Sequence, residues 1–220
     1  MLRFALLVGL SWSNLVTAQA PAAPVKERWE PEIAKLVQQQ TDAPVAAGKN
    51  LFIGSSSIRL WKLANDFPNH VCVNNGFGGC TMADVLRYAD RLIPPRKPSV
   101  VVVYAGDNDL ARGDAPQQIA RNFAGLVEVV HAALPRTKVY VISAKPSPRR
   151  WAMKEQFLET NRLLKAYADQ TDLVEYVDGW SPLVDEQGEP IPEYYQKDQL
   201  HLSPAGYAKW NELIAPVLAR

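Results

Sequence analysis

The sequence has few of the residues that build metal sites and disulfides. Its 220 residues include only two cysteines, Cys72 and Cys80, and three histidines. These residues form neither the Cys-x-x-Cys pairs nor the paired histidines on one helix face that are typical of zinc sites. No metal site is therefore expected. A disulfide between the two cysteines stays open, because spacing alone does not give its geometry.

An excess of charge of one sign is also lacking. The chain has 24 Lys and Arg residues against 23 Asp and Glu residues, a formal net charge of +1. Domains that bind nucleic acids carry a basic patch or a clear basic excess. The composition therefore gives no sign of a nucleic-acid partner, and it makes no prediction about the oligomeric state.

Long apolar runs are missing as well, since a membrane-spanning helix needs about 20 apolar residues. The first twenty residues instead follow the pattern of a signal peptide. Arg3 precedes an apolar run over residues 4–10, and the small residues Ala18 and Ala20 mark a cleavage site. We expect residues 1–20 to be removed and the protein to be exported to the periplasm or the medium, without stable insertion into a membrane.

The rest of the chain alternates between short apolar segments and amphipathic ones. Residues 21–48 are expected to form an Ala- and Pro-rich lead-in and a short helix over 29–40. Residues 49–220 are enough for one domain with a well-buried core. Such alternation is typical of a parallel sheet covered by helices on both faces. The sequence thus predicts an α/β fold, a three-layer α/β/α sandwich around a mostly parallel five-stranded sheet. The expected strands are 50–53, 71–73, 100–104, 138–143 and 173–177, and the expected helices lie near 58–65, 82–92, 116–134, 153–170 and 204–217.

Polar or glycine-rich clusters follow three of these strands, and a fourth cluster precedes the last helix. They are residues 54–57, 74–79, 105–109 and 198–201. In parallel α/β sheets, ligands bind beyond the carboxyl ends of the strands. We therefore expect the four clusters to meet at one edge of the sheet.

The fourth cluster contains a possible acid–base pair, because His201 follows Asp198 by three residues. A histidine that acts as a general base needs an acceptor that fixes its tautomer and orientation, and a nearby aspartate can supply it. A serine at 55–57 would be the matching nucleophile. The pair is equally compatible with a helix cap, since Ser203 and Pro204 are typical of the start of a helix.

Taken in order, the four clusters resemble the four blocks of the SGNH, or GDSL, hydrolase family, which carry a Ser, a Gly, an Asn and an Asp-x-x-His. The resemblance covers roughly residues 50–207. It implies a flavodoxin-like SGNH hydrolase fold and a serine esterase or acylhydrolase that needs no cofactor. The implied substrates are small-molecule esters with short acyl groups, glycan esters or lipid esters.

The resemblance also assigns roles to single residues. Ser56 aligns with the family nucleophile, His201 with the general base and Asp198 with the residue that orients the base. Gly79 and Asn108 match the family's oxyanion-hole glycine and asparagine. The oxyanion of the reaction would then receive hydrogen bonds from the N–H groups of Ser56 and Gly79 and from the side-chain amide of Asn108.

Three positions depart from the family pattern, and alternatives stay open. Ser55 and Cys80 stand where Asp is usual, and Asp107 replaces a frequent Thr. Asp107 and Asp109 allow the alternative of a metal-dependent phosphoesterase, although the cluster has no nearby histidine ligand. A second alternative is a binding module that keeps the fold without catalysis.

Overall fold

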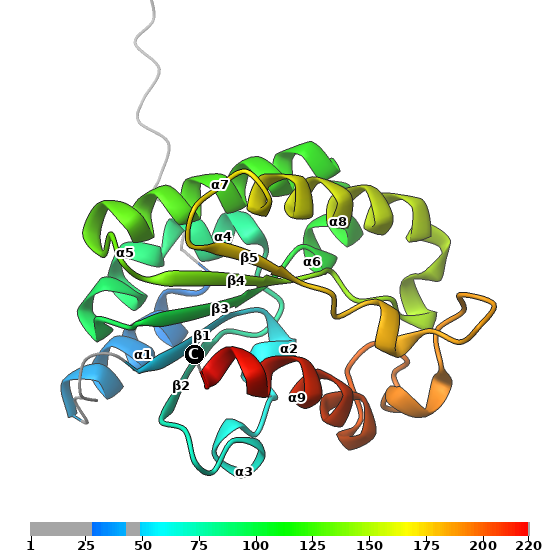
Figure 1. Ribbon diagram of the computed structural model, residues 1–220, viewed down its shortest axis with the longest axis horizontal. Helices are drawn as coiled ribbons and strands as arrows, with labels where there is room; N and C mark the ends of the chain where they lie inside the picture. The colour runs from blue at the N-terminus through cyan, green and yellow to red at the C-terminus, as the bar shows by residue number, and fades with distance from the viewer. Residues whose placement is uncertain (1–27, 43–48, 220) are drawn as a thin grey trace, which may run out of the picture.

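The predicted sheet is present, and all five of its strands run parallel. The computed structural model describes residues 28–42 and 49–219, so the expected signal peptide and the Ala- and Pro-rich stretch after it lie outside the described residues. The strands are ordered β2-β1-β3-β4-β5 across the sheet, as in flavodoxin-like folds (Figure 1). Their bounds are β1 Asn50–Gly54, β2 Cys72–Gly76, β3 Val100–Tyr104, β4 Lys138–Ile142 and β5 Val174–Val177.

Helices cover both faces of the sheet and complete the predicted three-layer sandwich (Figure 1). One face carries α1 Glu30–Asp42, α4 Met82–Arg87, α5 Ala89–Leu92, α7 Pro116–Ala133 and α8 Lys154–Ala168. The other face carries α2 Ser56–Arg59, α3 Leu63–Asp66 and α9 Pro204–Leu218. A further helix, α6 Asp107–Arg112, begins shortly after β3 ends.

Two hydrophobic cores form because successive strand side chains point to opposite faces of the sheet. In β1, Leu51 and Ile53 belong to the core on the face covered by α1, α4, α5, α7 and α8, whereas Phe52 belongs to the core beneath α9. The core beneath α9 is rich in aromatic rings, and the ring of Trp61 lies 5.5 Å from that of the fully buried Trp210. Trp61 is thus a core residue and does not line a substrate cleft.

The boundaries predicted for the second strand were wrong, because the strand includes polar residues. β2 extends through Asn74 and Asn75 to Gly76, although the sequence placed these residues in a loop. The buried Asn75 side chain donates a hydrogen bond to the Leu92 carbonyl at 2.9 Å, which compensates its burial. Strand assignment from apolar runs misses such satisfied asparagines.

Two helices expected to be continuous are each divided in two. In the stretch 58–65, α2 ends at Arg59 and α3 begins at Leu63. The Asn74 amide donates to the carbonyls of Ile58, in the last turn of α2, and of Trp61, between the two helices, at 2.7 and 3.2 Å. The stretch 82–92 is broken at Tyr88, whose backbone angles, φ −104° and ψ 7°, are not helical. Asp107 and Asp109, expected in a loop, instead lie in the first turn of α6.

The two cysteines are free thiols in the structure. Burial raises the pKa of the Cys72 thiol to about 11 and that of the fully buried Cys80 thiol well above its usual value. Both side chains are therefore protonated at neutral pH and behave as small apolar groups.

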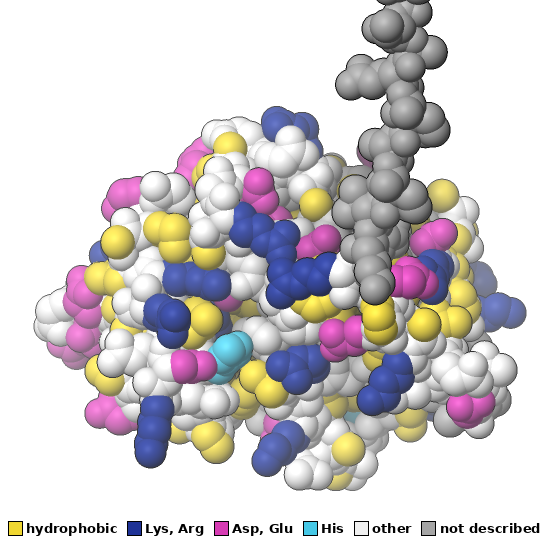
Figure 2. All heavy atoms as spheres, turned by 180° about the vertical axis from the view of Figure 1, so that it is seen from behind, with side chains coloured by type: hydrophobic (Ala, Val, Ile, Leu, Met, Phe, Trp, Pro, Cys, Tyr) yellow, Lys and Arg dark blue, Asp and Glu magenta, His cyan; other side chains and the backbone are white. Residues whose placement is uncertain are grey.

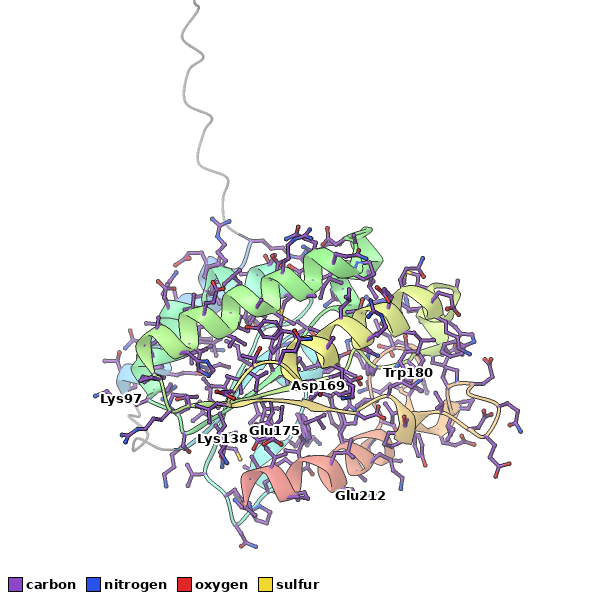
Figure 3. All side chains as sticks on the ribbon, turned by 45° about the horizontal axis from the view of Figure 1, so that its top comes forward. Lys97, Lys138, Asp169, Glu175, Trp180 and Glu212 are labelled. Carbon is purple, nitrogen blue, oxygen red and sulfur yellow. The ribbon has the colours of Figure 1, made fainter. Side chains whose placement is uncertain are left out.

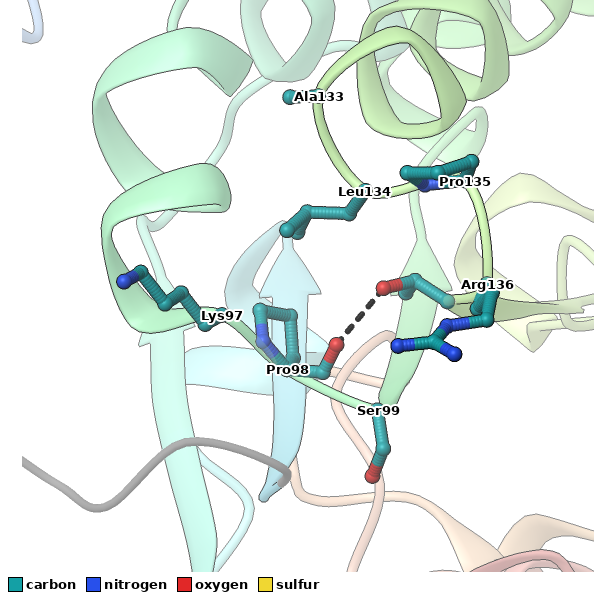
Figure 4. A pocket seen from close by; sticks show the side chains of 8 residues that line it. Lys97, Pro98, Ser99, Ala133, Leu134, Pro135 and Arg136 are labelled. Atoms are coloured by element: carbon teal, nitrogen blue, oxygen red, sulfur yellow. Dashed lines mark hydrogen bonds between the residues drawn. The ribbon is translucent and has the colours of Figure 1, made fainter.

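The amino ends of the strands form the edge opposite to the polar clusters. Figure 3 shows Lys97 and Lys138 at this end of the molecule and Trp180 at the other. A hollow of about 340 Å³ opens here, and Thr137 Oγ1 donates to the Pro98 carbonyl at 2.7 Å within it (Figure 4). The hollow is lined by residues 97–99 and 133–137, which include neither a histidine nor a carboxylate.

Asp109 joins α6 to α4 through a buried hydrogen bond. The Met82 N–H, in the first turn of α4, donates to both carboxylate oxygens at 2.9 and 3.0 Å. The Asp109 side chain is fully buried, and this burial raises its pKa to about 7, although the Met82 N–H opposes the shift. The folded protein therefore holds a proton on Asp109 that the unfolded chain releases near pH 4.

We predict that Asp109→Asn removes part of the pH dependence of stability. Between about pH 4 and pH 7 the folded state binds one proton more than the unfolded state, so this group makes the free energy of unfolding fall as the pH rises. Asparagine stays neutral and keeps a carbonyl oxygen for the Met82 N–H. Urea unfolding at pH 5 and pH 8 should show the variant gaining stability relative to wild type at the higher pH, by roughly 1–4 kcal/mol. Equal differences at both pH values would contradict this assignment.

Candidate active site

The α2 helix places Ser56 directly beyond the carboxyl end of β1. The Ser55 N–H donates to the Tyr104 carbonyl of β3 at 2.9 Å, and Ser56 is the first residue of α2. The helix lies close to β2, because a Cβ atom added to Gly76 would come within 2.4 Å of the Arg59 nitrogen. A larger residue at position 76 would push the helix, and Ser56 with it, away from the sheet.

The three consecutive serines have different environments. Ser55 and Ser57 are buried, and their Oγ atoms have no hydrogen-bond partner in the part of the chain that the structure describes. Ser56 is half-buried and lines the cleft described below. Of these three serines, Ser56 is therefore the one that lines the cleft.

His201 and Asp198 lie on a tight loop between η4 Pro192–Tyr194 and α9. Tyr195 and Leu202 form an antiparallel bridge, and the Gln196 N–H donates to the His201 carbonyl at 2.8 Å. Ser203 caps α9, since its hydroxyl accepts the Gly206 N–H at 3.2 Å. The helix cap is thus made by Ser203, which leaves the side chains of Asp198 and His201 free for another role.

The loop brings His201 between Ser56 and Asp198. His201 Nε2 lies 3.0 Å from Ser56 Oγ, and His201 Nδ1 lies 2.5 Å from Asp198 Oδ2. Partial burial disfavours the Asp198 carboxylate, but hydrogen bonds from the His201 ring and from the N–H groups of His201 and Leu200 outweigh it and lower the Asp198 pKa to about 2. Asp198 is therefore ionised at neutral pH and can orient the imidazole.

Ser56, Gly79 and Asn108, which line the same cleft, each carry an N–H group that can donate a hydrogen bond. Within residues 28–42 and 49–219, no acceptor is found for the backbone N–H of Ser56 or of Gly79. The Asn108 amide donates one hydrogen bond to the Cys80 carbonyl at 3.0 Å, which leaves its second N–H for the cleft. Gly79 has φ +79°, a left-handed conformation that other residues rarely adopt. Glycine is needed here for the backbone conformation, since a Cβ would meet only ordinary contacts.

One open cleft of about 460 Å³ is lined by Ser56, His201, Gly79 and Asn108. Asp198 is not among its lining residues. Its lining residues are mostly polar or glycine, and Leu200 contributes the only large apolar side chain among them. Sequence reasoning missed Glu32, Arg59 and Leu200, which belong to the same lining. The full lining is Glu32, Ser56, Arg59, Gly78, Gly79, Asn108, Leu200 and His201.

Glu32 reaches the cleft because α1 packs against the loop that follows β2. Trp29, just ahead of α1, makes an edge-on contact with the buried Phe77, with ring centroids 5.7 Å apart. Glu30 forms a two-pronged ion pair with Arg91 at 2.8 Å. No motif in the sequence links α1 to this loop, so only the packing shows that it forms one wall of the cleft.

The face of the molecule drawn in Figure 2 carries side chains of both charges. On the face drawn in Figure 2, a histidine lies beside an acidic side chain, with Lys and Arg side chains spread around them among acidic and apolar ones. The face therefore presents no uniform charged patch of the kind that nucleic acids bind.

The two aspartates that suggested a metal site point to different partners. Asp107 forms ion pairs with Lys145 and Arg150, whereas Asp109 accepts the Met82 N–H. Among residues 28–42 and 49–219, no group of three or more His, Cys, Asp or Glu side chains could hold a metal ion. The alternative of a metal-dependent phosphoesterase gains no support from this geometry.

Known proteins share both the sequence pattern and the fold. Residues 55–209 match the model of the GDSL-like lipase/acylhydrolase family. Esterase TesA of Pseudomonas aeruginosa is 30% identical over 86 residues, which cover 39% of this chain and 43% of TesA. The match thus spans less than half the length of that relative.

Solved structures match over most of the chain at low sequence identity. A Streptococcus pneumonia protein, described provisionally as a platelet activating factor, is 23% identical with a TM-score of 0.78, covering 86% of this chain and 92% of its own. A GDSL-like lipase from Bacteroides thetaiotaomicron is 23% identical, with a TM-score of 0.71 and coverages of 85% and 98%. An acetyl-xylooligosaccharide esterase from Geobacillus stearothermophilus is 16% identical, with a TM-score of 0.64 and coverages of 80% and 96%.

These likenesses establish the fold, and the family model covers well over half of the sequence, including every residue of the cleft except Glu32. The protein belongs to the GDSL-like lipase/acylhydrolase family of ester-hydrolysing enzymes.

Proposed function

We propose that the protein cleaves short-acyl carboxylic esters of polar alcohols through a Ser56–His201–Asp198 triad. The observation that supports this most directly is the chain of contacts from Ser56 Oγ to His201 Nε2 at 3.0 Å and from His201 Nδ1 to Asp198 Oδ2 at 2.5 Å. This arrangement is what a serine hydrolase needs to activate its hydroxyl. A binding module would gain nothing from it.

The reaction follows from the positions of the groups. His201 Nε2 takes the proton of Ser56 as Oγ attacks the ester carbonyl carbon, and ionised Asp198 stabilises the imidazolium that forms. The N–H groups of Ser56, Gly79 and Asn108 bind the oxyanion of the tetrahedral intermediate. His201 then protonates the leaving alcohol, and the acyl-enzyme that remains is hydrolysed by a water molecule activated by the same histidine. No cofactor takes part in these steps.

The lining of the cleft favours a short acyl group and a polar alcohol. A long acyl chain needs an extended apolar surface, but Leu200 is the only large apolar side chain that lines this cleft. Glu32 and Arg59 offer a carboxylate and a guanidinium that can hydrogen-bond to hydroxyl groups. Acetylated glycans combine both properties, and the structural relative from Geobacillus stearothermophilus acts on an acetylated oligosaccharide.

Such a substrate agrees with the export expected from residues 1–20, which lie outside the described residues. Within the described part of the chain, none of the helices is both long enough and apolar enough to cross a membrane. We therefore propose that the enzyme acts in the periplasm or the medium.

We predict that Ser56→Ala lowers kcat for p-nitrophenyl acetate by a factor on the order of 10⁴ or more, because the nucleophile is lost. A fluorophosphonate should form an adduct on Ser56 of the wild type, mapped by mass spectrometry. Ser55→Ala and Ser57→Ala are matched controls, since their buried hydroxyls have no partner among the described residues, and both should retain activity. An adduct on either neighbour, or an active Ser56→Ala enzyme, would overturn the assignment of the nucleophile.

The wild type should also prefer acetyl over octanoyl esters of p-nitrophenol. Because Leu200 is the only large apolar side chain that lines the open cleft, a long acyl chain would stay partly in water, and each added methylene should bring less than the roughly 0.8 kcal/mol that full burial of a methylene gives. We expect kcat/KM to be flat or to fall from acetyl to octanoyl. A steady rise with chain length would favour the lipid-ester alternative.

We further predict that Glu32→Gln selectively impairs hydrolysis of acetylated xylo-oligosaccharide. Loss of a charged hydrogen-bond acceptor for sugar hydroxyls should lower kcat/KM for this ester about tenfold more than for p-nitrophenyl acetate, whose alcohol has no sugar hydroxyls. Glu128→Gln makes the same chemical change on an exposed position of α7, outside the cleft, and should affect neither substrate. Equal losses on both esters would show that Glu32 does not contact the alcohol portion.

A further inference from the structure

We propose that Arg150 is a positioning residue that fixes the Asn108 amide as an oxyanion donor. The inference rests on the proposed function and adds a residue that lies outside the four family clusters. Arg150 belongs to η2 Pro148–Met153, the short helix that follows β4, and lies 42 residues from Asn108 in the sequence.

Hydrogen bonds hold both polar atoms of the Asn108 amide. Arg150 Nη2 donates to Asn108 Oδ1 at 2.9 Å, and Asn108 Nδ2 donates to the Cys80 carbonyl at 3.0 Å. A guanidinium can only donate and a carbonyl can only accept. Turning the amide over would place donor against donor and acceptor against acceptor, so only one orientation is stable. In that orientation the second N–H of Nδ2 remains for the cleft, which Asn108 lines.

The charge on Arg150 also strengthens the donor. A cation that donates to Oδ1 draws electron density from the amide and makes its N–H groups more positive, since linked hydrogen bonds polarise one another. The Arg150 side chain is only 14% exposed, so water screens this effect weakly. Both effects stabilise the negative oxygen that forms during ester cleavage.

Arg150 is in turn held by Asp107, the residue next to Asn108. Arg150 Nη1 lies 3.1 Å from Asp107 Oδ2, and Lys145 Nζ lies 3.3 Å from the same oxygen. The side chains of Asp107 and Lys145 are 5% and 1% exposed. Burial alone would raise the pKa of Asp107, but Lys145 and Arg150 outweigh it and hold the pKa below its usual value. The carboxylate therefore stays ionised and keeps the guanidinium in place.

The segment that carries Arg150 also contacts the loop that carries His201. The Arg149 N–H donates to the Gln199 carbonyl at 3.1 Å, and the Tyr195 hydroxyl donates to the Pro146 carbonyl at 2.7 Å. Residues 146–150 thus fix the base loop on one side and the oxyanion donor on the other.

The test is a double-mutant cycle with Arg150→Met and Asn108→Ala, measured with p-nitrophenyl acetate. One oxyanion donor is worth about 10²–10³ in kcat, so we expect Arg150→Met alone to lower kcat by about 10–100-fold with KM changed less than about threefold. In the Asn108→Ala background the same substitution should lower kcat by less than about threefold, because the amide that it positions is gone. Equal losses in both backgrounds, or no loss in either, would overturn the proposal.

Two further variants separate positioning from folding. Arg149→Met is the matched control, since Arg149 is the exposed neighbour and uses only its backbone in the contact with Gln199; it should keep wild-type kcat. Arg150→Lys keeps the charge but cannot bridge Asp107 and Asn108 in the same geometry, and we expect an intermediate kcat. If Arg150→Met melts below the assay temperature, Arg150→Lys takes its place in the cycle, and additive losses would overturn the proposal in the same way.

Fluorophosphonate labelling distinguishes this inference from the proposed function. If the wild type is labelled on Ser56 and Arg150→Met keeps full kcat, the role of Arg150 is wrong and the triad stands. If Ser56→Ala remains active, the proposed function fails, and the inference drawn from it fails as well.

Discussion

The hydrogen-bond register between β1 and its two neighbours determines where Ser56, Gly79 and Asn108 of the proposed site lie. Gly54 of β1 pairs with Gly76 of β2 on one side and with Tyr104 of β3 on the other, so the three strands end level. Each strand then continues within four residues into a functional segment, which carries Ser56, Gly79 or Asn108. A shift of one residue in either pairing would turn the side chains of a strand to the other face and separate these segments.

Much of this arrangement could be predicted from the sequence, because the signals are local. Apolar runs located β1 and β3 to within a residue, and the polar clusters after the strands pointed to one edge of the sheet. The extent of β2 could not be predicted, since the partner that makes a buried asparagine acceptable, the Leu92 carbonyl, lies 17 residues away. Arg150 and Glu32 were out of reach for the same reason. Their roles depend on helices that approach the site only through tertiary packing.

Two buried aspartates that are two residues apart have pKa values shifted in opposite directions, because their charged partners differ. Asp107 lies beside Lys145 and Arg150, and its pKa falls below the usual value, whereas Asp109 accepts the Met82 N–H, has no cation among the causes of its shift, and has its pKa raised to about 7. The first carboxylate therefore stays ionised beside Lys145 and Arg150, and the second, about half protonated at neutral pH, links α4 to α6. Adjacent carboxylates in a sequence suggest a shared ligand, but here one helical turn directs them to separate tasks.

The residues that match the family model form a shorter stretch than the residues that build the sheet and the cleft. The family match begins at Ser55, yet β1, which pairs with both β2 and β3 inside the sheet, and α1, which supplies Glu32, both come before it. A domain boundary placed where the family similarity starts would remove an interior strand and one wall of the cleft. The proposed contact between Glu32 and the alcohol portion of the substrate therefore depends on a segment that the family match does not include.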